Sequence, residues 1–215
     1  GDGFLARVGA ECRWRTVDSR LQVEEVDAGR LQRMVAVADA DPALRWEVHA
    51  GRVPWETLAG LMEPFTTFIN DQPLEGLDMP RMHYRLEGFH TWYAEMDERG
   101  GDHFVVLLRA GEEVVAMSEA SWDARTPDRL YQKLTAVNPA WRGRGLAGGV
   151  KARLVLLVRA RRPQVRTVVT YNARSNAPML AVNRNLGFRV YREEATWQLR
   201  REALEDYVVR ARRLG

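Results

Sequence analysis

The chain has 215 residues, of which 46% are hydrophobic, and this is enough to bury one core of ordinary size. No apolar run approaches the length of a membrane-spanning helix, and Gly1 to Val8 lack the basic region and apolar core of a signal peptide. The single cysteine, Cys12, excludes an intramolecular disulfide framework, and the four histidines show no metal-ligand spacing. We therefore expect a cytoplasmic globular domain with no membrane contact and no metal.

The first elements follow from local signals. Residues 1–20 have the pattern of a closing pair of strands, which is unusual at the start of a lone domain, although an ordinary amino-terminal strand pair would look the same. Leu21–Val26 then predicts a short strand. Asp27 is a typical N-cap for a helix from Ala28 to about Asp39, because its carboxylate can accept from the first helical N–H groups. This makes an opening β-α unit.

The middle of the chain is less regular at first and then strongly patterned. Between Pro42 and Pro80, aromatic residues are interspersed with prolines and acidic turns. Met82–Arg99 has apolar residues at three- and four-residue steps, which predicts a helix whose aromatic stripe lies mostly in the core. Three strands should follow as a meander: Phe104–Leu108, Val114–Ser121 and Leu130–Asn138.

The last third predicts a β-α-β unit. A helix from Leu146 to about Arg162 separates the third meander strand from a strand at Val165–Tyr171, so these two strands should be parallel. The remaining elements are a short helix, a strand and a terminal amphipathic helix: Ala177–Asn185, Arg189–Leu199 and Glu202–Arg213. The order predicts an α/β fold with a central mixed, mostly antiparallel twisted sheet flanked by helices.

The turn between the third meander strand and the long helix has the character of an anion site. It reads V-N-P-A-W-R-G-R-G-L-A from Val137 to Ala147. Gly143 and Gly145 let oxygen atoms approach the backbone, and a helix start offers unpaired N–H groups and a favourable dipole. The same letters also occur in tight turns and in disordered nucleic-acid-binding segments, so the turn needs support from elsewhere in the chain.

That support comes from a second motif. Residues Asn176 to Phe188 read N-x-x-M-L-x-x-N-x-x-L-G-F, about thirty residues after the turn. Together the two motifs resemble those of the GNAT acetyltransferases. The resemblance covers roughly Val23–Leu199, with specific motifs only in Thr135–Phe188. Tandem GNAT proteins, such as mycothiol synthase relatives, are most similar because they join an active second domain to a preceding one through a segment like residues 1–20.

The resemblance implies three parts. These are residues 1–20 as a possible remnant of a preceding domain, residues 21–200 as the GNAT domain and residues 201–215 as a carboxy-terminal helix. It also implies acetyl-CoA as co-substrate, with the pyrophosphate on the glycine turn and the pantetheine between the preceding strand and the second motif. Thirteen cofactor-binding residues are expected: Thr135, Ala136, Val137, Arg142, Gly143, Arg144, Gly145, Leu146, Ala147, Asn172, Asn176, Met179 and Asn183. The Val137 N–H should also face the thioester oxygen.

Glu119 is the candidate catalytic base. It is the one carboxylate in the apolar strand V-V-A-M-S-E-A-S-W, and alternation places it on one face with Val115 and Met117. Burial beside the Val137 strand would raise its pKa toward a value suited to accepting a proton. The alternatives are that Glu119 only pairs with an arginine or caps a sheet edge, and Asp123 is a poorer second candidate for the base.

The proton donor departs from the family pattern. Asn183 stands seven residues after Asn176, where many members carry tyrosine, and an amide has no useful titratable proton. We interpret Asn183 as a cofactor contact that donates a hydrogen bond toward the sulfur. The acid is then Tyr171, a water or the departing ammonium proton. Asn172 and Asn176 suit cofactor amides, and equally suit a strand end and a helix N-cap.

The charge distribution is uneven. No Asp or Glu lies between Asp128 and Glu193, a window with fourteen Lys or Arg, so the rest of a chain with net charge +3 carries −11. A basic half suits a polyanionic cofactor and an acidic half suits an amine, with the segment from Trp46 to Asp78 on the acceptor side. A solvated helix face would explain part of the basic window. Few aromatic residues in it are placed for stacking on nucleic acid.

We therefore expect direct transfer of an acetyl group to a primary amine of a small molecule, by a monomer or homodimer that binds no nucleic acid. Two alternatives stay open. A protein or peptide acetyltransferase would have an open groove, and a non-catalytic acetyl-CoA-binding or sensor domain would bind without transfer.

Overall fold

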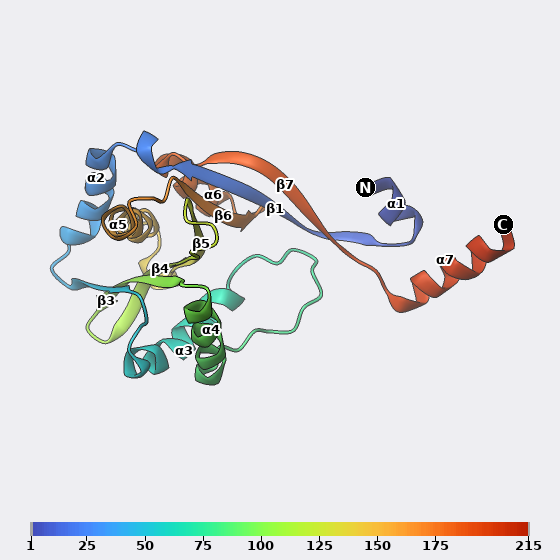
Figure 1. Ribbon diagram of the computed structural model, residues 1–215, viewed down its shortest axis with the longest axis horizontal. Coiled ribbons are helices and arrows are strands. Elements are labelled where there is room, and N and C mark those ends of the chain that lie inside the picture. Colours follow the sequence, from blue (N-terminus) through green and yellow to red (C-terminus); the bar gives the residue numbers. More distant parts are fainter. Residues whose placement is uncertain (1, 215) are drawn as a thin grey trace.

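A seven-stranded mixed sheet divides the molecule into two layers (Figure 1). The computed structural model describes residues 2–214, and its strands lie in the order β2-β3-β4-β5-β6-β1-β7. The strands are β1 (Glu11–Gln22), β2 (Leu44–Ala50), β3 (Asp102–Ala110), β4 (Glu113–Trp122), β5 (Arg129–Val137), β6 (Thr167–Ala173) and β7 (Arg189–Gln198). Neighbouring strands pair antiparallel except β5 and β6, which are parallel as predicted for the β-α-β unit.

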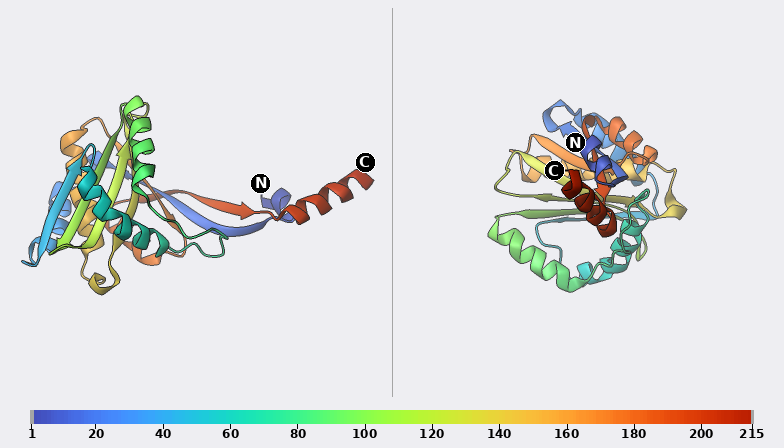
Figure 2. Two further views of the ribbon diagram at one scale, coloured as in Figure 1. Left: turned by 90° about the horizontal axis from the view of Figure 1, so that it is seen from below. Right: turned by 90° about the vertical axis from the view of Figure 1, so that its right-hand side faces the viewer.

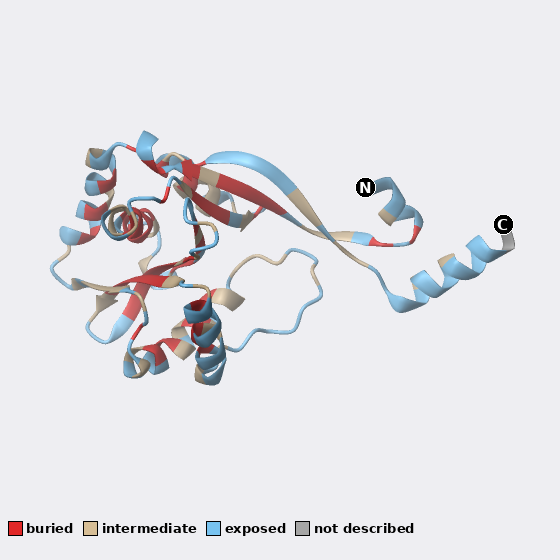
Figure 3. Cartoon of the chain, in the orientation of Figure 1, coloured by how far each residue is buried: buried red, intermediate tan, exposed pale blue. Residues whose placement is uncertain are grey.

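Helices cover both faces of the sheet (Figure 2). The helices are α1 (Asp2–Arg7), α2 (Ala28–Asp39), α3 (Trp55–Asn70), α4 (Leu86–Glu98), α5 (Leu146–Arg161), α6 (Ala177–Leu186) and α7 (Arg201–Leu214). One apolar cluster joins α2 and α5 to one face, and a second joins α3 and α4 to the other. Most buried residues lie in the sheet and on the helix sides that pack against it (Figure 3).

A two-stranded ribbon projects from this body. Residues 11–15 of β1 pair with β7 but not with β6, because the β1–β6 ladder begins only at Thr16. The far end of the ribbon carries α1 and α7, both largely exposed (Figures 1 and 3). The loop between α3 and α4 reaches back to the ribbon, where the Gly76 N–H donates to the Arg13 carbonyl and Gln198 bonds the Asp78 backbone. This loop is thereby fixed at its tip.

The bounds predicted for the first strand are wrong. The strand expected at Leu21–Val26 is the end of β1 followed by a 3₁₀ turn at Val23–Glu25, so the boundary drawn after residue 20 falls within a strand. The turn forms because the Val23 N–H bonds the Arg166 carbonyl, and the Arg159 guanidinium bonds the carbonyls of Val23 and Val26. The predicted cap is confirmed, since the Asp27 carboxylate accepts from two N–H groups of α2.

The irregular region contains two elements that the pattern did not predict, β2 and α3. Leu58, Leu61, Phe65 and Phe68 are buried at helical spacing, but Pro64 inside α3 disguises the period. The helix expected from Met82 begins only at Leu86. Side chains of α3 hold the preceding residues out of the helix: Asn70 bonds the backbone of Met82, and Thr66 Oγ1 accepts from the Tyr84 N–H.

Lys151 on α5 is a buried cation in the apolar layer. Its side chain is 1% exposed, its Nζ lies 5.3 Å from the Phe188 ring centroid, and among residues 2–214 it forms no ion pair. Burial lowers the pKa of Lys151 to about 7. The protonated form is therefore destabilising at neutral and lower pH.

Lys151→Met should raise the free energy of unfolding by roughly 4 kcal/mol at pH 6, because methionine keeps the volume and removes the desolvation cost that lowers the pKa of the lysine from 10.5 to about 7. The unfolded chain binds more protons than the folded chain between about pH 7 and the ordinary lysine pKa of 10.5, so the wild type gains stability across that window. Urea unfolding from pH 6 to 10 should show the gap between variant and wild type narrowing. An unchanged gap would contradict the buried charge.

Candidate functional site

Strand β5 parts from β6 halfway along its length. Their parallel ladder ends at the pair Gln132 and Thr170, although β5 continues to Val137. On its other side, β5 stays paired with β4 as far as Ala116 and Val137. The edge of β5 from Lys133 to Val137 therefore has no strand partner on the β6 side within the described chain.

The Val137 N–H points into this opening. Successive residues of a strand direct their N–H groups to opposite sides, and the Asn138 N–H donates to the Val115 carbonyl on β4 at 2.8 Å. The Val137 N–H must then face away from β4. Its carbonyl does the same, since it accepts from Arg142 Nε at 3.2 Å. The sequence-based prediction of a backbone donor at Val137 thus has a matching geometry.

The glycine turn follows β5 after a 3₁₀ turn at Pro139–Trp141, and it leads into α5. Gly143 and Gly145 adopt φ values of +76° and +78°, which side chains rarely permit. A Cβ at Gly143 would meet open space. Gly145 is the N-cap of α5, and because it has no side chain, it accepts no hydrogen bond from the first N–H groups of the helix through a side chain. The first N–H groups of a sixteen-residue helix are therefore presented to an adjacent groove.

That groove has a volume of about 380 Å³ and is lined by β5, the glycine turn, α6 and the residues that directly follow α3. It brings together ten of the thirteen predicted cofactor residues: Thr135, Ala136, Val137, Arg142, Gly143, Gly145, Leu146, Ala147, Asn176 and Met179. The two sequence motifs thus form opposite walls of one groove. Arg144, Asn172 and Asn183 are outside its lining.

The arginines of the turn have different partners. Arg142 forms an ion pair with Asp71, which also lines the groove, so one carboxylate neutralises the site in the structure. The guanidinium of Arg144 lies over the Trp141 ring, 4.6 Å from its centroid. An anion in the groove would replace the exposed Asp71 carboxylate as the partner of Arg142 at little cost, because surface ion pairs contribute little stability.

The three asparagines predicted to bind the cofactor also have different partners. Asn176 caps α6, with its Oδ1 accepting from the Met179 N–H at 3.2 Å, and it lines the groove as well. Asn183 is 2% exposed and donates its amide to Asn172 Oδ1 at 2.7 Å. The structure therefore assigns Asn172 and Asn183 to each other, and the Asn183 amide is not directed toward the groove as the resemblance implies.

A second and larger cavity, of about 740 Å³, lies on the α4 side of the same strands. Its lining comes from the loop before α4, the first half of α4, β4 and β5: Met82, His83, Tyr84, Arg85, Glu87, Gly88, Phe89, Trp92, Glu119 and Lys133. Lys133 of this cavity and Thr135 of the groove are two residues apart on β5, about 7 Å along the strand. The open edge of β5 thus lies between groove and cavity.

Glu119 lies in this cavity and is held by a buried chain of hydrogen bonds. The carboxylate is 6% exposed, and its Oε2 lies 3.3 Å from His103 Nε2. His103 Nδ1 lies 3.0 Å from the Tyr93 hydroxyl, which accepts from the Val53 N–H at 3.0 Å. Within residues 2–214, Glu119 forms neither of the alternatives considered for it, an arginine pair or an edge cap.

One order of donors, starting from the Val53 N–H, gives every bond of this chain a donor and an acceptor. Because the Tyr93 oxygen accepts from an N–H, its own proton is free to be donated to His103 Nδ1. In neutral His103, Nδ1 then accepts and Nε2 carries the proton, which points to Glu119. The carboxylate receives a fixed donor on one oxygen and keeps its second oxygen for the cavity.

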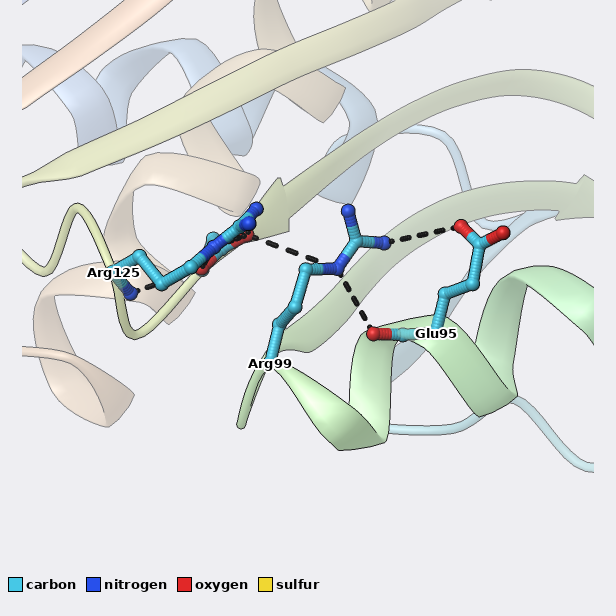
Figure 4. Close-up of polar contacts among 4 residues, drawn as sticks. Glu95, Arg99 and Arg125 are labelled. Atoms are coloured by element: carbon cyan, nitrogen blue, oxygen red, sulfur yellow. Dashed lines mark hydrogen bonds and ion pairs between the residues drawn. The ribbon is translucent and has the colours of Figure 1, made fainter.

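Asp123, the second candidate for the base, is bound by two arginines, one of which, Arg99, also bonds Glu95 (Figure 4). Arg125 donates to both of its oxygens, the nearest at 2.6 Å, and Arg99 approaches to 3.9 Å while also bonding Glu95. The hydrogen bonds from Arg125 are the largest cause that lowers the pKa of Asp123 to about 2. A carboxylate so stabilised is a poor proton acceptor at neutral pH, and this leaves Glu119 as the stronger candidate.

Tyr171, the predicted acid, lies elsewhere. It is 46% exposed, pairs with Asp18 across β1 and β6, and lines neither the groove nor the cavity. Burial first, and then the charges of Asp18 and Glu194, raise the pKa of Tyr171. The cavity contains a different tyrosine: burial and the nearby Glu119 charge raise the pKa of Tyr84 to about 12. Tyr84 therefore keeps its proton and is a hydrogen-bond donor at neutral pH.

Tyr84, Trp92, Lys133 and His103 were not singled out from the sequence. The sequence predicts only that the stripe with Phe89 and Tyr93 lies mostly in the core, and Tyr93 is fully buried. The register of the β3–β4 hairpin could have predicted that His103 lies near Glu119. Val105 pairs with Glu119, so His103 stands diagonally beside Glu119 on the same face, at a spacing that long side chains can bridge.

Two negative findings apply to the described residues. Within residues 2–214, no helix combines the length and hydrophobicity needed to cross a bilayer. The same part of the chain contains no cluster of three or more His, Cys, Asp or Glu arranged to hold a metal ion.

The sequence matches no family model and no curated protein. Solved structures are nevertheless similar to the fold. A tandem GNAT protein from the clavulanic acid biosynthesis pathway has a TM-score of 0.64 at 21% identity over 91% of this chain and 57% of its own. A GCN5-related N-acetyltransferase from Sphaerobacter thermophilus has a TM-score of 0.59 at 16% identity, covering 91% of this chain and 54% of its own.

A GCN5-related N-acetyltransferase-like protein from Streptococcus suis has a TM-score of 0.58 at 16% identity, over 93% of this chain and 67% of its own. This chain therefore has the fold of the GCN5-related N-acetyltransferases. It spans little more than half the length of the tandem GNAT and Sphaerobacter proteins.

Proposed function

We propose that this chain is an acetyl-CoA-dependent N-acetyltransferase that transfers the acetyl group directly to a primary amine of a small molecule. The observation that carries the proposal is the open edge of β5 between a glycine-lined groove and the cavity that holds Glu119. The fold similarity supports the same class of reaction.

The groove fits acetyl-CoA on its own features. The left-handed glycines leave space at the start of α5, and unpaired helix N–H groups together with Arg142 suit a pyrophosphate. The open edge of β5 offers strand-like hydrogen bonds to an amide-containing arm, opposite Met179 of α6. Acetyl-CoA would supply an activated acetyl thioester and leave as the thiol.

Glu119 would accept the proton of the incoming ammonium, so that the neutral nitrogen can attack the acetyl carbon. One carboxylate oxygen is fixed by His103, and the other faces the cavity. As the N–C bond forms, negative charge develops on the acetyl oxygen, and the Val137 N–H is the donor available at the open strand edge. When the C–S bond breaks, the sulfur takes up a proton as the amide nitrogen loses one.

His103 should therefore act as a positioning residue. We expect His103→Phe to lower kcat about tenfold with little change in KM, because the carboxylate loses a charge-assisted hydrogen bond while the ring contacts remain. His103→Gln, which keeps a side-chain donor, should recover most of the loss. Steady-state kinetics with matched unfolding curves check this, and equal losses in both variants would indicate a purely structural role.

A screen of amines by release of free CoA thiol tests the proposal as a whole. Acetyl-CoA binding is measured first by calorimetry, and each active amine is then confirmed by mass spectrometry of its acetyl product. The expected result is amine-dependent thiol release. Tight acetyl-CoA binding with no acceptor among small amines, peptides or proteins would favour a non-catalytic binding domain instead.

A further inference from the structure

The cavity around Glu119 contains opposite charges that are not neutralised by the protein. Lys133 lines the cavity with Glu119, and within residues 2–214 its ammonium lies within ion-pair distance of no carboxylate. Its Nζ lies over the Trp92 ring, 4.7 Å from the centroid. Arg85 and Glu87 also line the cavity, and they too form no ion pair in the described chain.

Lys133 and Glu119 are brought together by a β-bulge. Ser118 pairs with Thr135 and Ala120 with Gln132, so the single residue Glu119 stands opposite both Lys133 and Leu134. The extra residue changes which side chains of β5 face the α4 side, and both Lys133 and Glu119 reach the cavity. An ammonium and a carboxylate are thus presented side by side to a ligand rather than to each other.

A third cavity, of about 430 Å³, lies next to the Glu119 cavity, and its arginine side chains have carboxylate partners. It shares Lys133 and Trp92, but its arginines are already paired: Arg125 with Asp123, and Arg99 with Glu95 (Figure 4). An anion there would have to compete with fixed carboxylates. Lys133 therefore offers its charge to a ligand in the Glu119 cavity without that competition.

The remaining wall is aromatic. The Phe89 ring lies 6.0 Å from that of Tyr84 and 5.9 Å from that of Trp92, between centroids, and all three line the cavity. Rings so arranged bind flat apolar groups. A ligand that satisfies every part of this cavity has an amine for Glu119, an anionic group a few bonds away for Lys133, and an apolar body.

Resting on the proposed function, we propose that the acceptor is an amine with a neighbouring carboxylate and an apolar or aromatic side group, as in an aromatic α-amino acid. The amine points to Glu119 and the carboxylate to Lys133. The side group lies against Tyr84, Phe89 and Trp92. The charge distribution of the sequence predicts an acidic acceptor site. The proposed acceptor site is instead a cavity that contains both an acidic and a basic residue.

Binding tests the proposal without requiring turnover. Phenylalanine and phenethylamine, which lacks the carboxylate, are titrated by calorimetry into wild type, Lys133→Met and Arg125→Met, all with CoA present. Wild type should bind phenylalanine at least about tenfold more tightly than phenethylamine. Lys133→Met should abolish that preference while still binding phenethylamine, which also shows that the variant is folded. Arg125→Met is the matched control and should retain the preference.

Equal affinity for the two compounds, no binding of phenylalanine, or an unchanged preference in Lys133→Met would overturn the assignment. Transfer assays separate this failure from that of the proposed function. Lys133-dependent binding of phenylalanine without acetylation would contradict the proposed function but support the binding site. Acetylation of phenethylamine as fast as phenylalanine would contradict the proposed acceptor but support the proposed function.

Discussion

Glu119→Gln is expected to lower kcat by about a hundredfold or more, the range typical of losing a general base. Glutamine has the same shape and still accepts from His103, but it cannot take the ammonium proton. Steady-state rates from pH 6 to 9 with a known acceptor measure this loss.

Asp123→Asn is the matched control, because it makes the same carboxylate-to-amide change at the other candidate position. Asp123 is bound by Arg125 and its pKa is about 2, so no role as a proton acceptor is lost. We expect less than about a threefold change in kcat for this variant. Equal rates for Glu119→Gln and wild type at every pH would show that Glu119 is not the base.

Gly145→Glu should weaken acetyl-CoA binding by at least about a hundredfold, since several hydrogen bonds to charged oxygens are lost together. The new side chain begins at the N-cap of α5, where it brings bulk and negative charge to the groove lining. The first effect blocks the approach of the pyrophosphate and the second repels it. Calorimetric titration of acetyl-CoA gives the affinity.

Backbone strain has to be separated from this effect. Gly145 has φ +78°, and a Cβ there would lie 3.3 Å from Val37 Cγ1, so any side chain costs stability. Gly111 shares a left-handed φ of +60° in the β3–β4 turn, with nothing near its Cβ, and does not line the groove. Gly111→Glu should lose similar stability and bind acetyl-CoA like wild type. Equal binding by both variants would place the pyrophosphate elsewhere.

Much of the fold could be predicted because its elements carry strong local signals. The strands of the meander, the parallel β5–β6 pair and the helix after the glycine turn all lie within a few residues of the predicted ranges. The errors have tertiary causes. Pro64 hides the period of α3, and side chains of α3 keep Met82 to Arg85 extended, although their residues alone would permit a helix.

Part of the candidate site could also be predicted from local signals, and part of it could not. The groove was predictable because both of its motifs, the glycine turn at a helix start and the segment from Asn176, are local in sequence and support each other. The acceptor cavity was not, because Tyr84, Trp92, Glu119 and Lys133 come from three distant segments. Their proximity depends on the bulge in β5 and on the packing of α4. The Asn172–Asn183 pair is likewise a contact between a strand and a helix that no spacing reveals.

The most direct test of the account is a single-turnover experiment with excess protein, limiting acetyl-CoA and a primary amine identified by the screen. Free thiol and acetylated amine are quantified together over time. The account predicts one acetylated amine for every thiol released, and no release in Glu119→Gln on the same timescale. Thiol release that does not depend on the amine, or bound acetyl-CoA that persists unchanged beside every amine, would contradict it.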